Sequence, residues 1–248
     1  MKNFIKFLAV WLTLQISTAH TADLKEMSEE DRTILHTEIR DFLIKNPEVI
    51  LEAIEILNSR QSEIERKIDK ELTEQFADRL FNDGYSYFYG KQDANIKIVE
   101  FIDYRCGYCR KAHTEIKQLL EVEDGIKIII KEYPILGKQS KNSAEFAMAV
   151  KQIYGPEAYE QVHETLFAFN GKITLSTLKK ISEGFGYDTQ QIFDQMNSEK
   201  VLSKIEKNIY LGKQMSITGT PTFIIQDEIF RGFLSLESIQ QIIAEKRK

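Results

Sequence analysis

Apolar residues in the first third of the chain recur with helical spacing on a strongly polar background. From residue 50 to residue 68 they alternate steps of four and three, with one polar member, and the step is then four up to residue 80 (Ile50, Ile54, Leu57, Gln61, Ile64, Ile68, Leu72, Phe76, Leu80). A narrow apolar stripe of this kind is typical of a helix that packs along another helix. Because no glycine or proline occurs between residues 48 and 83, the pattern predicts one long helix.

A shorter helix is predicted before the long one. Ser28, with Asp31 three residues later, resembles a capping box at its start, and Asn46 with Pro47 predicts the N-cap and the first position of the long helix. The two helices form a predicted arm, residues 23–82. Charged helices with so narrow an apolar stripe do not fold well alone, so we expect self-association through residues 23–80. The alternative is that the arm packs on its own domain.

Beyond residue 85 the apolar residues come in short continuous runs rich in β-branched side chains. The runs NIKIVEFIDY and GIKIIIKEYP have the length and composition of buried strands, and GTPTFIIQDEIFRGF is typical of two strands joined by a turn near Asp227. Segments with helical spacing fill residues 140–212, and a last helix is expected to begin at Ser235. This order predicts an α/β domain, residues 85–248, with a central sheet and an inserted helical subdomain at about 140–212.

The first residues of the chain follow a different pattern. Lys2 and Lys6 precede the apolar run FLAVWLTLQI, and small residues follow, up to Ala19. This order is typical of a secretory signal peptide over residues 1–19, with cleavage after Ala22 as the second choice. Because an apolar run of about ten residues is short for a membrane span of about twenty, we favour export over a membrane anchor and expect a periplasmic location.

Composition narrows the class of protein only slightly. Hydrophobic residues make up 42% and charged residues 29% of the 248 residues, as in ordinary soluble proteins. The formal net charge of −5 gives no electrostatic reason to expect a nucleic-acid partner. The chemistry that stands out belongs to the two cysteines of the chain, Cys106 and Cys109.

These two cysteines lie directly after a predicted strand, at the start of a predicted helix. A disulfide between Cys106 and Cys109 closes a very small loop and constrains the unfolded chain little, which disfavours a purely structural role in an oxidising compartment. The positive end of the helix favours the thiolate of Cys106, and Cys109, one turn further on, should be more buried. This asymmetry indicates a nucleophile, Cys106, and a resolving thiol, Cys109.

A metal site is the main chemical alternative. Tetrahedral zinc takes four ligands, but the chain has no second cysteine pair, and His36, His113 and His163 have no ligand spacing to the first. We therefore expect no resident metal or other cofactor. Transient binding of Cu(I) by two thiolates is chemically plausible and defines a rival function, that of a copper-binding thiol protein.

An acidic residue, Glu100, lies six residues before Cys106, within the apolar run IVEFI. An acid in a strand buried on both faces is costly unless it has a use. Burial would raise its pKa toward the range that is useful for proton transfer. The alternative is a glutamate that faces solvent at the edge of the sheet.

Three motifs together, VEFIDYRCGYC, KEYPILG and SITGTPTFII, resemble the DsbA family of bacterial thiol-disulfide oxidoreductases. The resemblance extends roughly from residue 85 to the C-terminus and implies a thioredoxin-like fold. It implies that Pro221 is a cis-proline facing the cysteine pair, that Thr220 offers its backbone to a substrate strand, and that Glu100 accepts the proton of Cys109. It also implies disulfide-containing client proteins and a membrane redox partner.

The family resemblance leaves the direction of electron flow open. Strongly oxidising DsbA proteins have Pro-His between the cysteines, whereas this chain has Gly107 and Tyr108. Gly-Tyr, with threonine before the cis-proline, resembles disulfide isomerases, and the arm resembles that of ScsC-type proteins. Because oligomeric isomerases present several active sites to one client, we favour an isomerase over a net dithiol oxidase. A purely structural adaptor that works through the arm is a third hypothesis.

Overall fold

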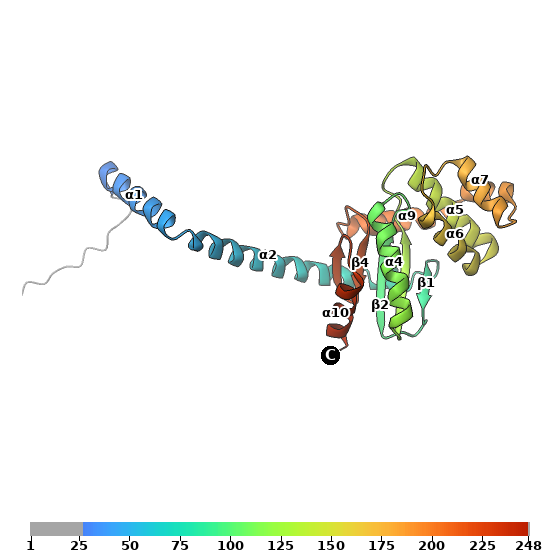
Figure 1. Ribbon diagram of the computed structural model, residues 1–248, viewed down its shortest axis with the longest axis horizontal. Coiled ribbons are helices and arrows are strands. Elements are labelled where there is room, and N and C mark those ends of the chain that lie inside the picture. Colours follow the sequence, from blue (N-terminus) through green and yellow to red (C-terminus); the bar gives the residue numbers. More distant parts are fainter. Residues whose placement is uncertain (1–26, 248) are drawn as a thin grey trace, which may run out of the picture. The chain divides into compact units, whose positions relative to one another are not determined.

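The computed structural model describes residues 27–247. The predicted signal peptide and the first residues of the predicted arm lie outside this range. The chain divides into two compact units with a boundary after Ser59, inside a long helix (Figure 1). In the described range no helix is long and apolar enough to cross a membrane.

The first unit consists of α1 (Glu29–Lys45) and the beginning of α2 (Glu48–Gln75). Ser28 forms the predicted capping box, because its Oγ accepts from the Asp31 backbone N–H at 3.1 Å and its own N–H donates to the Asp31 carboxylate at 3.4 Å. No residue of α1 is buried. Ten large apolar side chains of the unit are 38–64% exposed (Ile34, Leu35, Ile39, Phe42, Ile44, Ile50, Leu51, Ile54, Ile56, Leu57).

The junction between these helices differs from the sequence prediction. The Asn46 side chain does not cap the start of α2, because its amide donates to the Phe42 carbonyl at 2.8 Å and so caps the end of α1. Unpaired carbonyls at a helix end attract such short amide side chains. The long helix also ends earlier than predicted. At Phe76 the backbone leaves the helical conformation, and a separate helix, α3 (Ala77–Phe81), follows.

The second unit is built around a five-stranded sheet of order β1-β3-β2-β4-β5. The central strands β2 and β3 run parallel and are joined by α4 (Gly107–Val122), and the outer strands pair antiparallel to their neighbours. The strands are β1 (Tyr87–Gly90), β2 (Ile96–Ile102), β3 (Ile126–Glu132), β4 (Thr222–Ile225) and β5 (Glu228–Arg231). Burial of the central strands on both faces explains their continuous apolar runs.

The helical subdomain is inserted between β3 and β4, as the sequence predicts. It comprises α5 (Lys138–Tyr154), α6 (Pro156–Ala168), α7 (Leu175–Gly184), α8 (Thr189–Met196) and α9 (Glu199–Gln214). The C-terminal helix α10 (Leu236–Lys246) begins after its N-cap Ser235. The predicted α/β fold with an inserted helical subdomain and preceding helices is confirmed.

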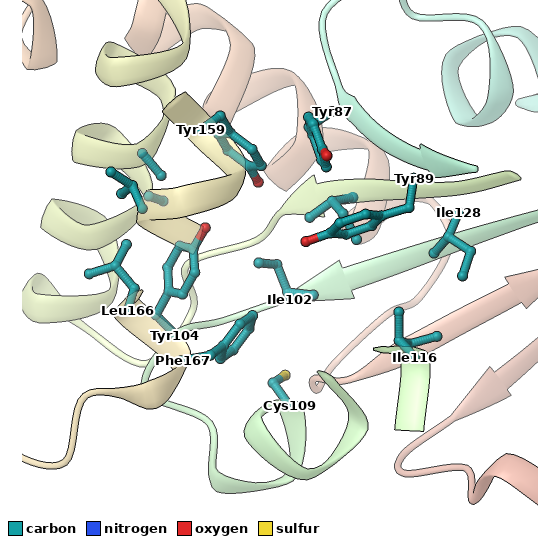
Figure 2. Packing of buried hydrophobic residues seen from close by; sticks show 14 of the residues in the cluster. Tyr87, Tyr89, Ile102, Tyr104, Cys109, Ile116, Ile128, Tyr159, Leu166 and Phe167 are labelled. Atoms are coloured by element: carbon teal, nitrogen blue, oxygen red, sulfur yellow. The ribbon is translucent and has the colours of Figure 1, made fainter. Parts of the chain in front are cut away.

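Two buried clusters hold the second unit together. The larger one joins β2 and β3 to α4 and to the insertion, and Tyr104, Tyr159 and Phe167 are among its largest fully buried side chains (Figure 2). The smaller one contains Val99 and Phe101 of β2 and side chains from the end of α9. The end of β2 therefore lies between two packed layers, which holds the residues that follow it in place.

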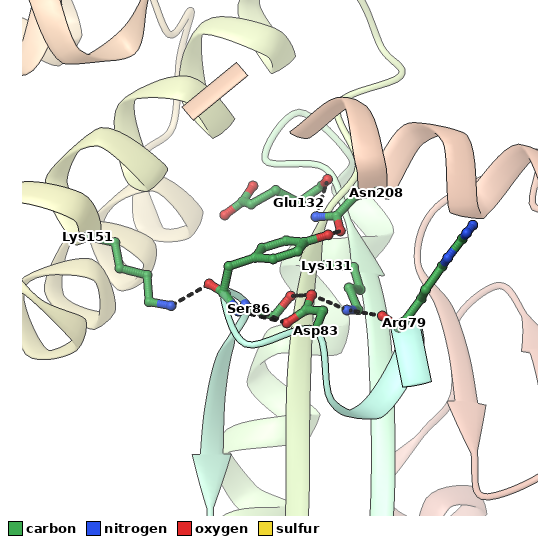
Figure 3. Close-up of polar contacts among 8 residues, drawn as sticks. Arg79, Asp83, Ser86, Lys131, Glu132, Lys151 and Asn208 are labelled. Atoms are coloured by element: carbon green, nitrogen blue, oxygen red, sulfur yellow. Dashed lines mark hydrogen bonds and ion pairs between the residues drawn. The ribbon is translucent and has the colours of Figure 1, made fainter. Parts of the chain in front are cut away.

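The part of α2 that belongs to the second unit is fixed to the sheet. Asp69 forms a bidentate ion pair with Arg231 of β5, with both N–O distances 2.8 Å. On β3, Lys131 is 0% exposed; it donates to the Arg79 carbonyl at 2.8 Å and pairs with the Asp83 carboxylate (Figure 3). These contacts bind α2, α3 and the loop after them to the sheet.

Candidate active site

The loop between β2 and α4 places Cys106 at the carboxyl end of the central strands. Asp103, which is 1% exposed, organises this loop. Its backbone carbonyl accepts from Cys106 N–H at 3.0 Å, and its Oδ1 accepts from Arg105 N–H at 2.8 Å. Its other carboxylate oxygen, Oδ2, accepts from the backbone N–H groups of Ile135 and Leu136, at 2.9 and 3.0 Å. The cysteine loop and the loop after β3 are therefore held side by side.

Cys106 is the N-cap of α4, as its position before the helix predicts. Its Sγ accepts from the backbone N–H of Cys109 at 3.4 Å and donates, as a thiol, to the Thr220 carbonyl at 3.0 Å. Hydrogen bonds from Cys109 are the largest influence on this thiol, and together with smaller ones from Thr220 and Tyr108 they lower the pKa of Cys106 to about 5. The residue is 9% exposed, so the protein covers most of it.

Cys109 has the opposite environment. It is 0% exposed and lies in the large cluster near Phe167 and Ile102 (Figure 2). Burial raises the pKa of its thiol strongly, and its hydrogen bond to Cys106 and the charge of Glu100 act in the same direction. Both cysteines are free thiols in this structure. At neutral pH one sulfur is therefore a thiolate and the other a thiol, the asymmetry that the sequence predicts.

Glu100 lies inside the sheet rather than at its edge. It is 2% exposed, and in the described part of the chain its Oε1 has no hydrogen-bond partner. Burial, and then the charge of Cys106, raise the pKa of Glu100 to about 8. The solvent-facing alternative is therefore wrong. A buried carboxyl without a partner can accept a proton from a neighbour near neutral pH.

Four further predicted residues lie close to Cys106 in the chain or in space. The peptide bond between Thr220 and Pro221 is cis, and the Thr220 carbonyl contacts Cys106 as described above. Tyr108 is 60% exposed, with Lys111 Nζ 5.4 Å from the centre of its ring. A Cβ at Gly107 would meet no atom within 4 Å, so packing does not require glycine at this position.

Sequence reasoning missed two buried acids near the site. One is Asp103, whose role as a loop anchor is indicated only by its position between a buried strand and the cysteine. The other is Glu132 at the end of β3, 1% exposed, whose Oε1 accepts from Tyr104 at 2.7 Å and from Tyr159 at 2.6 Å. Burial raises the pKa of Glu132 to about 8. Because Tyr104 precedes Cys106 by two residues, Glu132 ties the cysteine loop to α6 of the insertion.

Metal-ligand geometry is absent from the described residues, where no group of three or more His, Cys, Asp or Glu could hold a metal ion. His113 Nε2 lies 3.0 Å from a Glu164 oxygen, and His163 contacts the Tyr104 hydroxyl through Nδ1 at 2.8 Å. His113, in α4, and His163, in α6, pack against each other and against Phe167. A cavity of about 630 Å³ lies between α3 and α9 and includes neither cysteine, so the reactive thiol lies outside it.

The chain is similar to known oxidoreductases that act on thiols and disulfides. The chain is 30% identical to a thioredoxin-like oxidoreductase of Silicibacter pomeroyi DSS-3, covering 68% of this chain and 96% of that one with a TM-score of 0.65. It is 28% identical to the thiol-disulfide exchange protein alpha-DsbA2 of Wolbachia pipientis, covering 73% and 97% with a TM-score of 0.68. Disulfide bond formation protein D of Bacillus subtilis is 25% identical over 179 residues, which cover 64% of this chain and 76% of that protein.

Two other matches concern parts of proteins. Residues 31–63 match the copper resistance protein ScsC N-terminal domain. The chain also matches Na⁺/H⁺ antiporters named NhaA, such as NhaA 3 of Salinispora tropica at 20% identity, and spans 24% of the length of that relative.

The fold, the paired thiols and these relatives define a thiol-disulfide oxidoreductase of the DsbA and ScsC type. The chain belongs to the thioredoxin family, which it matches over residues 82–245. The predicted family resemblance is thereby confirmed.

Proposed function

We propose that this protein is an exported disulfide isomerase in which Cys106 is the nucleophile and Cys109 the resolving thiol. The thiolate of Cys106 attacks one sulfur of a client disulfide, the client S–S bond breaks, and the other client sulfur leaves as a thiolate. A client thiolate then attacks the mixed disulfide at the client sulfur and expels the Cys106 thiolate. The client gains a different disulfide, and no net electrons are transferred.

Cys109 resolves the mixed disulfide when the client does not complete this exchange. Its proton passes to Glu100 when this carboxyl is ionised, and its thiolate attacks the Sγ of Cys106, which forms the internal disulfide and releases the client as a thiolate. The protein is oxidised by two electrons and the client is reduced by two. Cys109 needs a base because its pKa is raised, and a Glu100 pKa of about 8 leaves a fraction of this carboxyl ionised near neutral pH, which can accept the proton.

Thr220 and Pro221 are proposed to bind the client backbone beside the reactive sulfur. The segment they form leads into β4, and the Thr220 carbonyl lies within 3.0 Å of the Cys106 sulfur. An extended client segment at this position would bring its disulfide to the exposed side of Cys106, in the manner of an added strand.

The choice of isomerase over net oxidase rests on the first unit. Ten of its large apolar side chains are 38–64% exposed, and no residue of α1 is buried. This single observation favours assembly of several copies through residues 23–80, which would present more than one Cys106 to a misfolded client. The Cys106 pKa of about 5 lies between the roughly 3.5 of a strongly oxidising DsbA and the roughly 7 of thioredoxin, and Gly107 and Tyr108 replace the Pro-His of strong oxidants.

The decisive experiment is refolding of a scrambled multi-disulfide client by the mature protein. We expect Cys106→Ser to reduce the rate to background. We expect Cys109→Ser to retain part of the isomerisation rate, because that route needs only the first thiol. A net oxidase would instead lose its activity in both variants and would oxidise a reduced client stoichiometrically. Full refolding by Cys106→Ser would reject the enzyme hypothesis and favour the adaptor.

The assembly can be tested separately by light scattering. Leu57→Glu places a charge in the apolar stripe and should lower the mass of the mature protein to that of a monomer, whereas Ser59→Glu, two residues away on another face of α2, should not. A monomeric wild-type protein would remove the main support for an isomerase. The periplasmic location and the membrane redox partner remain part of the proposal, and localisation of a full-length fusion tests the first of them.

The match to a copper resistance protein domain favours a second candidate, a Cu(I)-binding thiol pair. Two thiolates would be the ligands, but burial raises the pKa of Cys109 and keeps it protonated, which weakens this candidate. Tight stoichiometric uptake of Cu(I) without redox turnover would favour it over the isomerase.

A further inference from the structure

The surface around Cys106 has a charge opposite to that of the protein. Three segments meet there: residues 105–111, which contain both cysteines, residues 134–141, and residues 213–221. Contacts hold them together, because the Thr220 carbonyl lies 3.0 Å from Cys106 Sγ and the Asp103 carboxylate accepts from Ile135 and Leu136. The three segments contain six lysine or arginine residues and no aspartate or glutamate, in a chain of net charge −5.

Most of these cations are available to a ligand. The side chains of Arg105, Lys111, Lys138 and Lys213 are exposed, and none of them forms an ion pair with a carboxylate of residues 27–247. The other two cations are engaged. Lys141 lies 3.6 Å from Glu145, and Arg110 donates to Asn170 and to the Phe169 carbonyl at 3.1 Å each.

The two buried acids beside the cysteines do not neutralise this surface. Asp103 is buried, and both its carboxylate oxygens accept backbone hydrogen bonds. Glu100 is buried and has a raised pKa, so it is largely protonated at neutral pH. Apolar side chains lie on the same segments as the cations, because Tyr108, Ile135 and Leu136 are 60%, 36% and 47% exposed. The surface therefore combines positive charge with apolar contact area.

We propose that this surface selects client segments in which acidic and apolar residues flank the disulfide that Cys106 attacks. The proposal rests on the proposed thiol-disulfide exchange and adds its substrate preference. Arg105 and Lys111 lie one residue before and two residues after the cysteine pair, so they are placed to meet residues next to the client cysteine. Several exposed charges of one sign raise the encounter rate with oppositely charged segments, and salt screens this effect.

The test uses three peptides of equal length, each with one cysteine in a disulfide with a small neutral thiol. The residues around the cysteine are acidic, neutral or basic, and a tyrosine is kept in all three. The second-order rate constant of the first exchange with the full mature protein is measured at low and high salt. We expect the acidic peptide to react about tenfold faster than the basic one at low salt, with the ratio falling toward one at high salt.

Charge reversals locate the effect. Arg105→Glu with Lys138→Glu should invert the order of the acidic and basic peptides. Lys91→Glu, whose lysine pairs with Asp124 beyond the opposite end of α4, should leave the ratio unchanged. Each variant is judged by the ratio of its rate constants for the acidic and basic peptides, so that a change in the reactivity of Cys106 itself cancels. If the double charge reversal fails to fold, the milder variant Arg105→Gln with Lys138→Gln should abolish the preference.

The possible results distinguish failure of the proposed thiol-disulfide exchange from failure of the proposed substrate preference. Absence of exchange with all three peptides would reject the proposed function. Equal, salt-independent rates for the three peptides would reject the substrate preference while leaving the exchange reaction standing. Equal peptide rates together with binding to vesicles of anionic lipid would assign the surface to a membrane and overturn the preference as well.

Discussion

Two regions of the second unit bury ionisable groups in different ways. Around Lys131 the buried charges are paired: the ammonium contacts the Asp83 carboxylate and the Arg79 carbonyl, and Asp83 also accepts from Ser86 (Figure 3). At the end of β2, by contrast, Glu100 is buried with an oxygen that has no partner among the described residues. Loss of the partner of a buried charge destabilises the fold strongly, whereas a buried carboxyl oxygen without a partner is free to take part in proton transfer.

The largest effect that tests this comparison is expected from Asp83→Ala. The substitution leaves the fully buried ammonium of Lys131 without its counter-ion, which should cost about 3 to 5 kcal/mol of unfolding free energy. Urea unfolding measures it, and the thiolate pKa of Cys106 should not move. Glu183→Ala, which breaks the exposed pair with Lys179, should cost less than about 1 kcal/mol. Equal losses in the two variants would contradict the structural role of the Lys131 pair.

The second effect concerns Glu100→Gln and the pH dependence of stability. Because the folded pKa is raised from the ordinary 4.5 to about 8, the folded state holds a proton that the unfolded state releases. The stabilisation from this proton is present below about pH 4.5 and is lost as pH rises to about 8. The wild type should therefore lose unfolding free energy between pH 5 and pH 8, whereas the glutamine variant should not. The difference between the two proteins should grow by a few kcal/mol over this range, because a change of one pKa unit corresponds to about 1.4 kcal/mol. Urea unfolding of both proteins across this pH range measures the gain.

This experiment has an internal control in Glu132. Its pKa is raised to about 8 by the same burial, so Glu132→Gln should also remove part of the pH dependence. The two variants should differ in chemistry: Glu100→Gln slows the step in which Cys109 resolves a mixed disulfide, and Glu132→Gln does not slow it directly. Equal slowing by both substitutions would remove Glu100 from the proton-transfer role.

The smallest effect is expected from Thr220→Val. The Thr220 side chain is one of the weaker contributions that lower the pKa of Cys106, so its loss should raise that pKa slightly. Titration of the thiolate by its ultraviolet absorbance measures the change. Thr218→Val, at an exposed position two residues earlier, serves as the control and should leave the pKa unchanged.

The sequence predicts the central elements of the fold because their patterns are long and continuous. The buried strands β2 and β3, the β4–β5 hairpin and the helix after Cys106 all follow from such runs. The pattern does not predict β1, since YFYG is only four residues long and is held by pairing with β3, about forty residues away. It also misplaces the end of α2, because Phe76 leaves the helix to pack against the sheet, a tertiary effect that helical spacing does not contain.

In the candidate site, too, the sequence predicts the residues of local motifs but not those that depend on tertiary contacts. The positions of Cys106, Cys109 and Pro221 follow from local motifs, and Glu100 stands out as an acid in an apolar run. Asp103 and Glu132 do not stand out, because what distinguishes them is their partners: backbone groups of the loop after β3 for the first, and two tyrosine hydroxyls for the second. A polar residue at the end of a strand usually faces solvent, and only the packed structure reveals the exceptions.

The central claim is that the two thiols of one pair differ strongly in pKa. The most direct test is a titration of the reduced mature protein, with thiolate absorbance and the rate of alkylation followed together. We predict one ionisation with a midpoint near 5 that disappears in Cys106→Ser, and no ionisation of the second thiol below the ordinary value of a cysteine. Ionisation of both thiols together near the ordinary value of about 8.5 would contradict the account.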